Sequence, residues 1–254
     1  ALTPELRTAL SQPEVDDSQA AKLAGILDYI NGLYTVYTQL FVYDRGGRIV
    51  AASRHNTDAP PLGTIDTATM ENVLALSNEQ AYHVSGFEPS ALYDGRNTYI
   101  YHAAVRDPED EKRVVGGIGI VFDSEREFEA MLRSGLGSDP GVSAYYIDRQ
   151  GRILSSTHAA RPVGSRLAMD PALLSLSRGQ SVSRVVEHDG QYAVMGCAAS
   201  QGYREFKVTD GYVEDVLAVV FQPLGAVQEG RNSRPDPQAR SEEPLPAYVP
   251  GQKQ

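Results

Sequence analysis

The densest group of side chains that could hold a ligand lies between residues 82 and 123. It comprises four tyrosines, a histidine, an arginine and an aspartate: Tyr82, His83, Tyr93, Arg96, Tyr99, Tyr101 and Asp123. Hydroxyl groups fix the orientation of a ligand, and a carboxylate in a low-dielectric cavity pairs strongly with a cation. Tyr99 and Tyr101 would share one face of a strand, because side chains alternate along it. The group therefore predicts a pocket for a small molecule with a cationic group.

The same side chains also have a structural interpretation. Asp123 follows an apolar strand and precedes an acidic helix, where aspartate is a common N-cap. The tyrosines can pack across neighbouring strands without any ligand. Arg96 lies in a predicted turn, where we expect a solvated side chain. Both interpretations remain open from the sequence.

The sequence contains none of the residue patterns that catalysis or metal binding requires. The five histidines have no metal-ligand spacing, and no H-E-x-x-H or G-x-S-x-G motif is present. Cys197, the only cysteine, has small and apolar neighbours and is predicted to be buried and structural. Gly116, Gly117 and Gly119 lie inside an apolar run, which favours close approach of a helix or ligand to a sheet over phosphate binding. We predict no cofactor, no metal and no enzymatic activity.

Charge and hydropathy exclude further classes of protein. The 254 residues carry a formal net charge of −10, and the basic residues are scattered along the chain. A binding surface for nucleic acid or for an anionic bilayer is therefore not expected. The longest apolar run, Val114 to Phe122, has nine residues, against roughly 20 in a transmembrane helix.

The first element that would support this cluster is a helix over residues 1–40. Apolar residues recur at steps of three and four from Leu23 to Leu40, which produces one apolar stripe. Pro13 suits the first turn of such a helix. The stripe either packs against its own domain or pairs with a second copy of the chain in a homodimer.

The middle of the chain repeats itself. Phe41–Ser53 returns as Tyr145–Thr157, an offset of 104 residues, and Gly117–Phe122 resembles Val216–Phe221 at an offset of 99. The first pair predicts two strands around an Asp-x-x-Gly turn, in which aspartate bonds the backbone and glycine supplies the positive φ. Because the matches keep their order, we predict two homologous modules over residues 41–132 and 141–225.

Two segments fall outside this repeat. The insertion Ala198–Glu214 alternates charged and aromatic residues and predicts either a docking hairpin or an exposed hairpin without a partner. Residues 226–254 hold five of the fifteen prolines and few large apolar side chains. This composition predicts a disordered tail or linker that leads to a further signalling domain.

With this order of elements, the chain resembles the tandem (double) Cache sensor domains of bacterial chemoreceptors and sensor kinases. The resemblance covers residues 14–225 and depends on the helix that leads into Phe41-Val-Tyr-Asp, the twin hairpins and the apolar last strands. It implies an α/β (α+β) fold with a long N-terminal helix and two PAS-like modules, each an antiparallel sheet with flanking helices. It also implies small-molecule sensing by the first module, in signal transduction of the chemotaxis type.

The resemblance further implies an extracytoplasmic, periplasmic part of a membrane-anchored protein, with a cytoplasmic location as the alternative because of the proline-rich tail. Amino-acid-binding members of the family hold the ligand carboxylate with an Arg-x-Trp-Tyr element, which residues 63–70 lack. They hold the ammonium group with a tyrosine and an aspartate at the places of Tyr93 and Asp123. We therefore expect a primary or quaternary amine as the ligand. The alternative is a degenerate Cache domain that serves as a protein-interaction scaffold.

Overall fold

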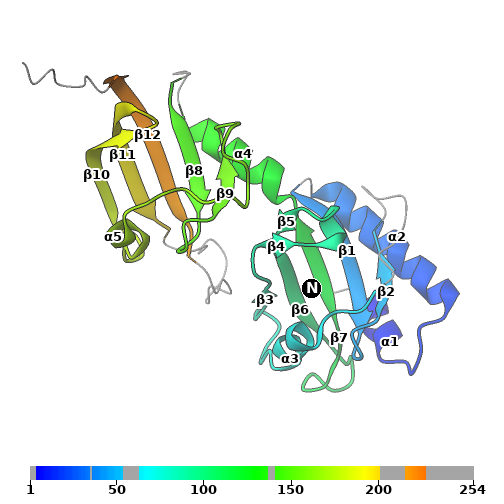
Figure 1. Ribbon diagram of the computed structural model, residues 1–254. Coiled ribbons are helices and arrows are strands. Elements are labelled where there is room, and N and C mark those ends of the chain that lie inside the picture. The colour runs from blue at the N-terminus through cyan, green and yellow to red at the C-terminus, as the bar shows by residue number, and fades with distance from the viewer. Residues whose placement is uncertain (1–3, 35, 54–62, 137–140, 201–214, 227–254) are drawn as a thin grey trace, which may run out of the picture.

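The computed structural model describes residues 4–34, 36–53, 63–136, 141–200 and 215–226 (Figure 1). It is an α+β fold, as predicted, with two five-stranded antiparallel sheets joined by one helix. The helices are α1 (Pro4–Leu10), α2 (Asp17–Leu33), α3 (Thr67–Leu74), α4 (Ser124–Gly135) and α5 (Pro171–Leu174), with a 3₁₀ turn η1 at Ala91–Tyr93. Among the helices that the structure describes, none combines the length and apolar composition of a membrane span.

The first sheet has the strand order β2-β1-β7-β6-β3. Its strands are β1 (Tyr37–Asp44), β2 (Ile49–Ala52), β3 (His83–Val84), β6 (Ile100–Arg106) and β7 (Val114–Phe122). A short ribbon of β4 (Glu88–Pro89) and β5 (Asn97–Thr98) lies beside it. The apolar strand β7 is central, as its continuous apolar sequence indicates.

The second sheet has the order β9-β8-β12-β11-β10. Its strands are β8 (Ser143–Ile147), β9 (Ile153–Ser156), β10 (Ser181–His188), β11 (Gln191–Ala199) and β12 (Leu217–Ala226). Each strand has a counterpart at the same place in the first sheet, so the repeat in the sequence coincides with a repeat in topology. In both β-hairpins the predicted turn is present: Asp44 and Asp148 accept backbone N–H bonds within the turn, and the glycines have positive φ.

The N-terminal region differs from the single helix predicted over residues 1–40. It forms two helices, and the chain is already in strand β1 from Tyr37. Pro13 lies between the helices rather than in a first turn. The second helix starts at a capping box instead, in which Asp16 accepts from the backbone N–H of Gln19 and the Gln19 side chain accepts from that of Asp16. Tyr37 is extended because it pairs with β7.

The two faces of the first sheet are covered differently. Helices α1 and α2 pack on the face that carries Leu40 and Val42, and Arg7 of α1 donates to the carbonyls of Arg106 and Asp107. The opposite face carries Phe41 and Tyr43, which pack with Met70 of α3 and with Tyr93. The alternation along β1 therefore separates two cores.

The glycines of β7 allow these aromatic rings to lie on the sheet. Phe41 is opposite Gly119 and Tyr43 is opposite Gly117. A Cβ atom on Gly119 would lie 2.0 Å from the Phe41 ring, and one on Gly117 would lie 2.3 Å from the Tyr43 ring. The close approach predicted for this strand is thus made by rings of the neighbouring strand rather than by a helix or a ligand.

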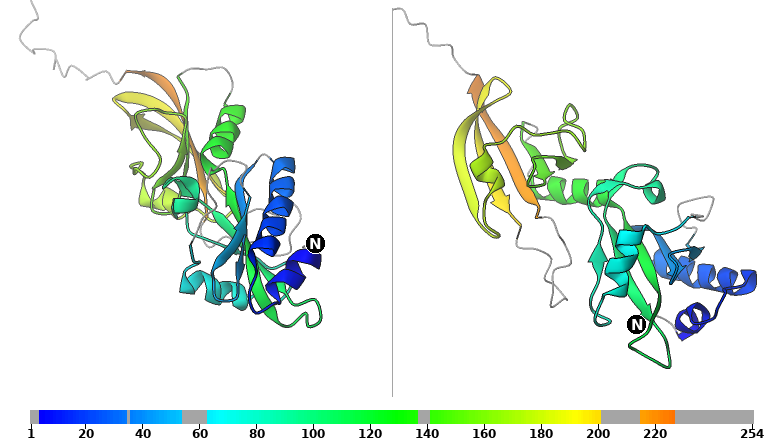
Figure 2. Two further views of the ribbon diagram at one scale, coloured as in Figure 1. Left: turned by 90° about the vertical axis from the view of Figure 1, so that its right-hand side faces the viewer. Right: turned by 60° about the horizontal axis from the view of Figure 1, so that its bottom comes forward.

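Helix α4 connects the two sheets (Figure 2). The acidic helix predicted after Asp123 is present and runs from Ser124 to Gly135. Phe128 projects into an apolar cluster drawn from both halves of the chain, with Tyr99 of the first and Tyr146 and Leu154 of the second. Cys197 is buried in the core of the second sheet, as predicted. The insertion predicted over Ala198–Glu214 begins inside β11, which ends at Ala199, and its residues 201–214 lie outside the described residues. The tail predicted over residues 226–254 also lies outside them, apart from Ala226 at the end of β12.

Candidate functional site

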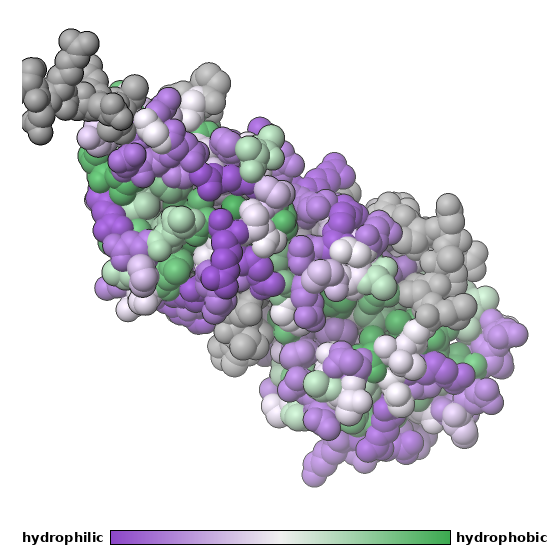
Figure 3. All heavy atoms as spheres, viewed as in Figure 1, coloured by the Kyte–Doolittle hydropathy of each residue, from purple (hydrophilic) through white to green (hydrophobic). Residues whose placement is uncertain are grey.

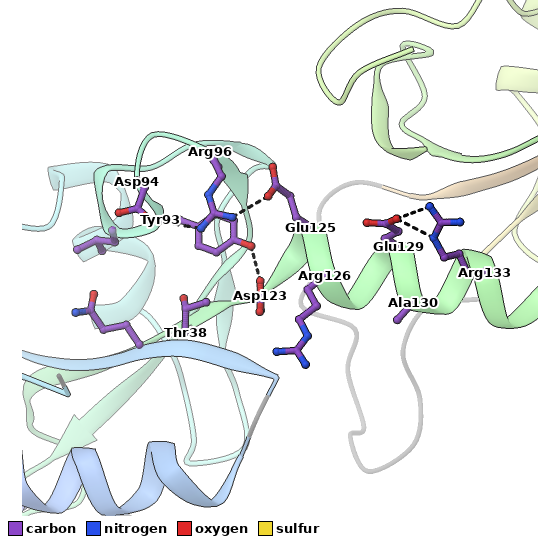
Figure 4. A pocket seen from close by; sticks show the side chains of 12 residues that line it. Thr38, Tyr93, Asp94, Arg96, Asp123, Glu125, Arg126, Glu129, Ala130 and Arg133 are labelled. Carbon is purple, nitrogen blue, oxygen red and sulfur yellow. Dashed lines mark hydrogen bonds and ion pairs between the residues drawn. The ribbon is translucent and has the colours of Figure 1, made fainter. Parts of the chain in front are cut away.

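A cleft of about 620 Å³ lies where the first sheet meets α4. Three segments line it: Thr38 and Gln39 of β1, the turn from Leu92 to Arg96, and α4 with the residue that precedes it, Asp123. Hydrophilic side chains cover the surface around α4 in the space-filling view (Figure 3). Figure 4 shows the charged groups of the turn and of the helix facing each other across the cleft.

Asp123 and Tyr93 are in direct contact in this cleft. The Tyr93 hydroxyl donates to Asp123 Oδ1 at 2.5 Å. Asp123 occupies the N-cap position of α4, yet its side chain makes no capping hydrogen bond. The start of α4 is held instead by the buried Ser124, whose hydroxyl is 2.9 Å from Thr98 Oγ1. The carboxylate is therefore directed to the cleft and not to the helix backbone.

Tyr93 is a stable hydrogen-bond donor. Its side chain is almost completely buried. Burial raises the pKa of the Tyr93 hydroxyl, and the hydrogen bond to Asp123 and the charge of that carboxylate raise it further. The hydroxyl consequently keeps its proton at neutral pH and holds the Asp123 carboxylate in one orientation.

Arg96 forms one wall of the cleft, and its side chain is still 42% exposed, in line with the solvated turn residue expected from the sequence. Its guanidinium carbon lies 3.8 Å from the centre of the Tyr93 ring. It makes ion pairs with Glu125 at 2.7 Å and with Asp94 at 3.3 Å. The Arg96–Glu125 pair joins the turn of the first sheet to α4. Since its charge is already compensated and its contacts are within the protein, Arg96 shapes the site more than it offers a free cation.

Arg126 is a site residue that the sequence patterns above do not single out. It lines the cleft together with Glu129 and Arg133, which pair with each other at 2.7 Å on successive turns of α4. No ion pair joins Arg126 to any residue that the structure describes, and Figure 4 shows its side chain extending on the same side of the helix as Asp123. The spacing 126, 129 and 133 is that of one helix face, and this signal could have found it.

The other predicted site residues are not part of this cleft. Tyr82, Tyr99 and Tyr101 belong to the apolar cluster between the two sheets. The ring centres of Tyr82 and Tyr101 lie 6.4 Å apart. The ring centre of Tyr99 lies 5.1 Å from that of Phe87, which belongs to the same cluster. These rings pack on one another without a ligand, as the structural alternative from the sequence expects, although of the three tyrosines only Tyr101 lies in a strand. The structure brings together Tyr93, Arg96 and Asp123 and separates them from the remaining four residues.

His83, the fourth, lies next to His102 on the sheet face that carries Tyr43. The His102 Nδ1 atom is 3.2 Å from the Tyr43 hydroxyl, and the two imidazole ring centres are 6.1 Å apart. Burial, together with the smaller effect of the neighbouring His83, lowers the pKa of His102 to about 4. This face is occupied by the protein's own rings, and no group of metal-ligating side chains occurs among the described residues.

Comparison with known proteins places the fold. No family model matches the chain, and no curated protein matches its sequence. Solved structures do resemble it. The extracellular domain of the histidine kinase rpHK1S-Z16 has a TM-score of 0.56 at 12% identity, covering 86% of this chain and 82% of that one. The sensor domain of the Vibrio cholerae histidine kinase DctB has a TM-score of 0.55 at 14% identity, covering 87% and 84%.

A chemoreceptor resembles it to the same degree. The ligand-binding domain of Pseudomonas fluorescens CtaA, solved with L-serine, has a TM-score of 0.53 at 15% identity, covering 86% of this chain and 84% of that one. At such identities the similarity shows the fold and nothing finer. The chain has the fold of sensor domains of histidine kinases and chemoreceptors, in agreement with the resemblance to Cache domains found in the sequence.

Proposed function

We propose that this chain is a ligand-binding sensor domain of a bacterial signalling protein of the chemoreceptor or sensor-kinase type, and that it binds a small amine in the cleft beside α4. The observation that carries the proposal is the Asp123 carboxylate, which is held in the cleft by Tyr93 and does not cap its own helix. Structural neighbours that are extracellular domains support an extracytoplasmic position. They also support a binding role in place of catalysis.

The chemistry of the cleft favours a primary amine over a quaternary one. An ammonium group can donate to Asp123 while that carboxylate still accepts from Tyr93, since a carboxylate offers about four acceptor positions. A quaternary ammonium depends on open aromatic faces. Tyr93 is buried and its ring is covered by Arg96, and Tyr99 and Tyr101 lie in the cluster between the sheets. An N–H donor therefore fits better than a methylated cation.

The test is calorimetric titration of the chain with a series of primary amines, beside a thermal-shift screen. A ligand at one hundred times its Kd stabilises the folded chain by about 2.7 kcal/mol. We expect Asp123→Asn to weaken amine binding at least tenfold, because the ammonium then lies in the cleft without its counter-charge. Asp94→Asn is the matched control: this carboxylate lines the same cleft but is 74% exposed and bonds Arg96. Equal amine affinity of wild type and Asp123→Asn would refute the proposal.

The second candidate is the scaffold function. It is favoured by the filled sheet face, where Phe41, Tyr43 and His102 take the space next to the glycine strand. A scaffold predicts that no amine, amino acid or organic acid changes the melting temperature. It also predicts that the chain captures a partner signalling domain equally well with and without added small molecules.

A further inference from the structure

The cleft beside α4 contains more charged groups than a site for a simple amine requires. Four carboxylates and three guanidinium groups line it. Most of them compensate each other within the protein: Arg96 pairs with Asp94 at 3.3 Å and with Glu125 at 2.7 Å, and Arg133 pairs with Glu129 at 2.7 Å. Once these pairs are set aside, one negative and one positive group remain.

The remaining groups are the Asp123 carboxylate and the Arg126 guanidinium. Both line the same cavity, and neither makes an ion pair with any residue that the structure describes. Residues three apart along a helix are neighbours, and opposite charges there attract. Here, however, Asp123 is held by the Tyr93 hydroxyl, and Figure 4 shows Arg126 extending away from Tyr93 and Glu125. The cleft thus keeps one charge of each sign apart and available to a ligand.

Helix α4 gains no stability from a cation at residue 126. The first turn of a helix lies at the positive end of its dipole, where acidic residues are favoured and basic ones are not. Glu125 and Glu127 in the first turn and Arg133 in the last follow this rule. Arg126, which lies in the first turn and is exposed, does not. Neither the helix dipole nor an ion pair in the described part of the chain accounts for this arginine.

The two groups complement a ligand that carries both charges. An ammonium group donates hydrogen bonds to Asp123, and a guanidinium donates two parallel hydrogen bonds to a carboxylate. Because Asp123 and Arg126 are directed apart, the ammonium and the carboxylate of the ligand must be separated by a spacer. An α-amino acid carries both groups on one carbon. The cleft of about 620 Å³ has room for a longer chain, since small-molecule pockets measure roughly 300–1,000 Å³.

We propose that the cleft binds an ω-amino acid, with the ammonium group on Asp123 and the carboxylate on Arg126. This inference rests on the proposed function, because the amine uses the same carboxylate, and it adds the second half of the ligand. Arg126 then determines which amines the site selects.

Calorimetric titration with three ligands tests the inference. 4-Aminobutyrate has both charges and a spacer, butylamine has the same chain with a methyl group in place of the carboxylate, and glycine has both charges without the spacer. We expect 4-aminobutyrate to bind at least tenfold more tightly than either of the others. If it binds no more tightly than butylamine or glycine, the inference is overturned and the amine site on Asp123 stands. If none of the three binds, the proposed function fails as well.

The variant Arg126→Glu tests the role of the arginine by reversing its charge. We expect it to bind 1,4-diaminobutane at least tenfold more tightly than 4-aminobutyrate, whereas the wild type has the opposite preference. The variant should fold with an unchanged melting temperature, because residue 126 is exposed and glutamate suits the first turn of a helix. Arg126→Lys is the control, and it should keep the preference for 4-aminobutyrate. An Arg126→Glu variant that still prefers 4-aminobutyrate would show that the ligand carboxylate does not meet this residue.

Discussion

Among single residues, the partner of a side chain determines its role. Asp123 lies at the N-cap position of α4, where an aspartate is expected to accept a hydrogen bond from the helix backbone. Its carboxylate is instead bonded by Tyr93, thirty positions earlier in the chain. Arg96 and Arg126 show the same principle. The first is compensated by Glu125 and Asp94, whereas the second has no ion pair within the described residues of its cleft.

Arg126 should affect which amines are accepted. Its guanidinium repels a cation that approaches Asp123 and attracts a ligand that also carries an acidic group. We expect Arg126→Gln to raise the affinity for a simple primary amine and to lower the affinity for an amine with a carboxylate, each by severalfold. Arg133→Gln is the control, since Glu129 already compensates that charge. Calorimetry measures the affinity for each of the two ligands. If the ratio of these two affinities is the same in wild type and Arg126→Gln, the prediction is contradicted.

His102 should make stability depend on pH. Its pKa is lowered by burial from 6.5 to about 4 in the folded state, so the unfolded chain binds a proton between these pH values and the folded chain does not. The free energy of unfolding should therefore fall as pH drops from 6.5 towards 4, by up to about 3 kcal/mol. Urea denaturation at a series of pH values measures this slope.

The variant His102→Gln isolates that effect. It keeps a polar group near the Tyr43 hydroxyl but does not titrate. The difference in stability between wild type and variant should shrink as the pH is lowered, because only the wild type loses stability through His102. A difference that is constant between neutral pH and the folded-state pKa would show that this histidine is not the cause.

Among the secondary-structure elements, strand β7 and helix α2 show how glycine acts in two contexts. Gly119 leaves room for the Phe41 ring, and a Cβ there would lie 2.0 Å from it. A Cβ atom added to Gly25 in α2 would have no other atom within 4 Å. In the strand the missing side chain permits packing, whereas in the helix it only lowers helix propensity.

These two glycines give a matched pair of variants. Gly119→Ala should destabilise the chain by about 1–3 kcal/mol, because the Phe41 ring must move out of a well-packed position. Gly25→Ala should stabilise it by roughly 0.5–1 kcal/mol through helix propensity. Chemical denaturation measures both values. A Gly119→Ala variant as stable as Gly25→Ala would contradict this account of the strand.

Helix α2 also presents the apolar stripe that the sequence offered for a homodimer. Tyr29 and Leu33 are 71% and 61% exposed, and Tyr29 lines an apolar groove of about 920 Å³ between α1 and α2. With Ile26 they repeat at steps of three and four, the spacing of a helix–helix seam. We propose that α2 pairs with its copy in a second chain.

The variant Leu33→Asp should then convert a dimer into a monomer, because it places a charge in the seam. Sedimentation velocity measures the change. Val185→Asp, a substitution at a valine that is 61% exposed on the second sheet, should leave the mass unchanged. A wild-type chain that sediments as a monomer at high concentration would refute the pairing.

Across the whole molecule, α4 connects the cleft to the second sheet. Its first turn carries Glu125, which pairs with Arg96. Phe128, three residues on, packs on Tyr99 of the first half and on Tyr146 of the second, with ring centres 6.2 and 5.8 Å apart. A ligand that changes the position of the first turn of α4 therefore acts on the contact between the halves.

Removing the Phe128 ring should uncouple the two halves. We expect Phe128→Ala to lower stability towards the low end of about 3–5 kcal/mol, and calorimetry to show two thermal transitions instead of one. Amine binding at Asp123 should persist, but it should no longer protect amides of the second sheet from hydrogen exchange. Met131→Ala on the same helix, at a half-exposed position, is the control. Undiminished protection in Phe128→Ala would exclude this route.

The local features of this protein follow from its amino-acid sequence alone. The twin Asp-x-x-Gly hairpins, the apolar strand at the centre of each sheet and the burial of Cys197 obey short-range patterns, because turn geometry and side-chain alternation depend on neighbouring residues. The break of the N-terminal helix is equally local, since the signals of Pro13 and the Asp16–Gln19 box are both present in the sequence.

Which of the predicted site residues meet depends on tertiary contacts. Tyr93 and Asp123 come together across thirty residues, while Tyr99 and Tyr101, closer to Tyr93 in sequence, are drawn into the cluster around Phe128. The alternation of side chains on a strand shows that two residues share a face but not what covers that face. The relative positions of the strands, α4 and the η1 turn depend on contacts between segments far apart in the chain, and these contacts determine where the cleft opens.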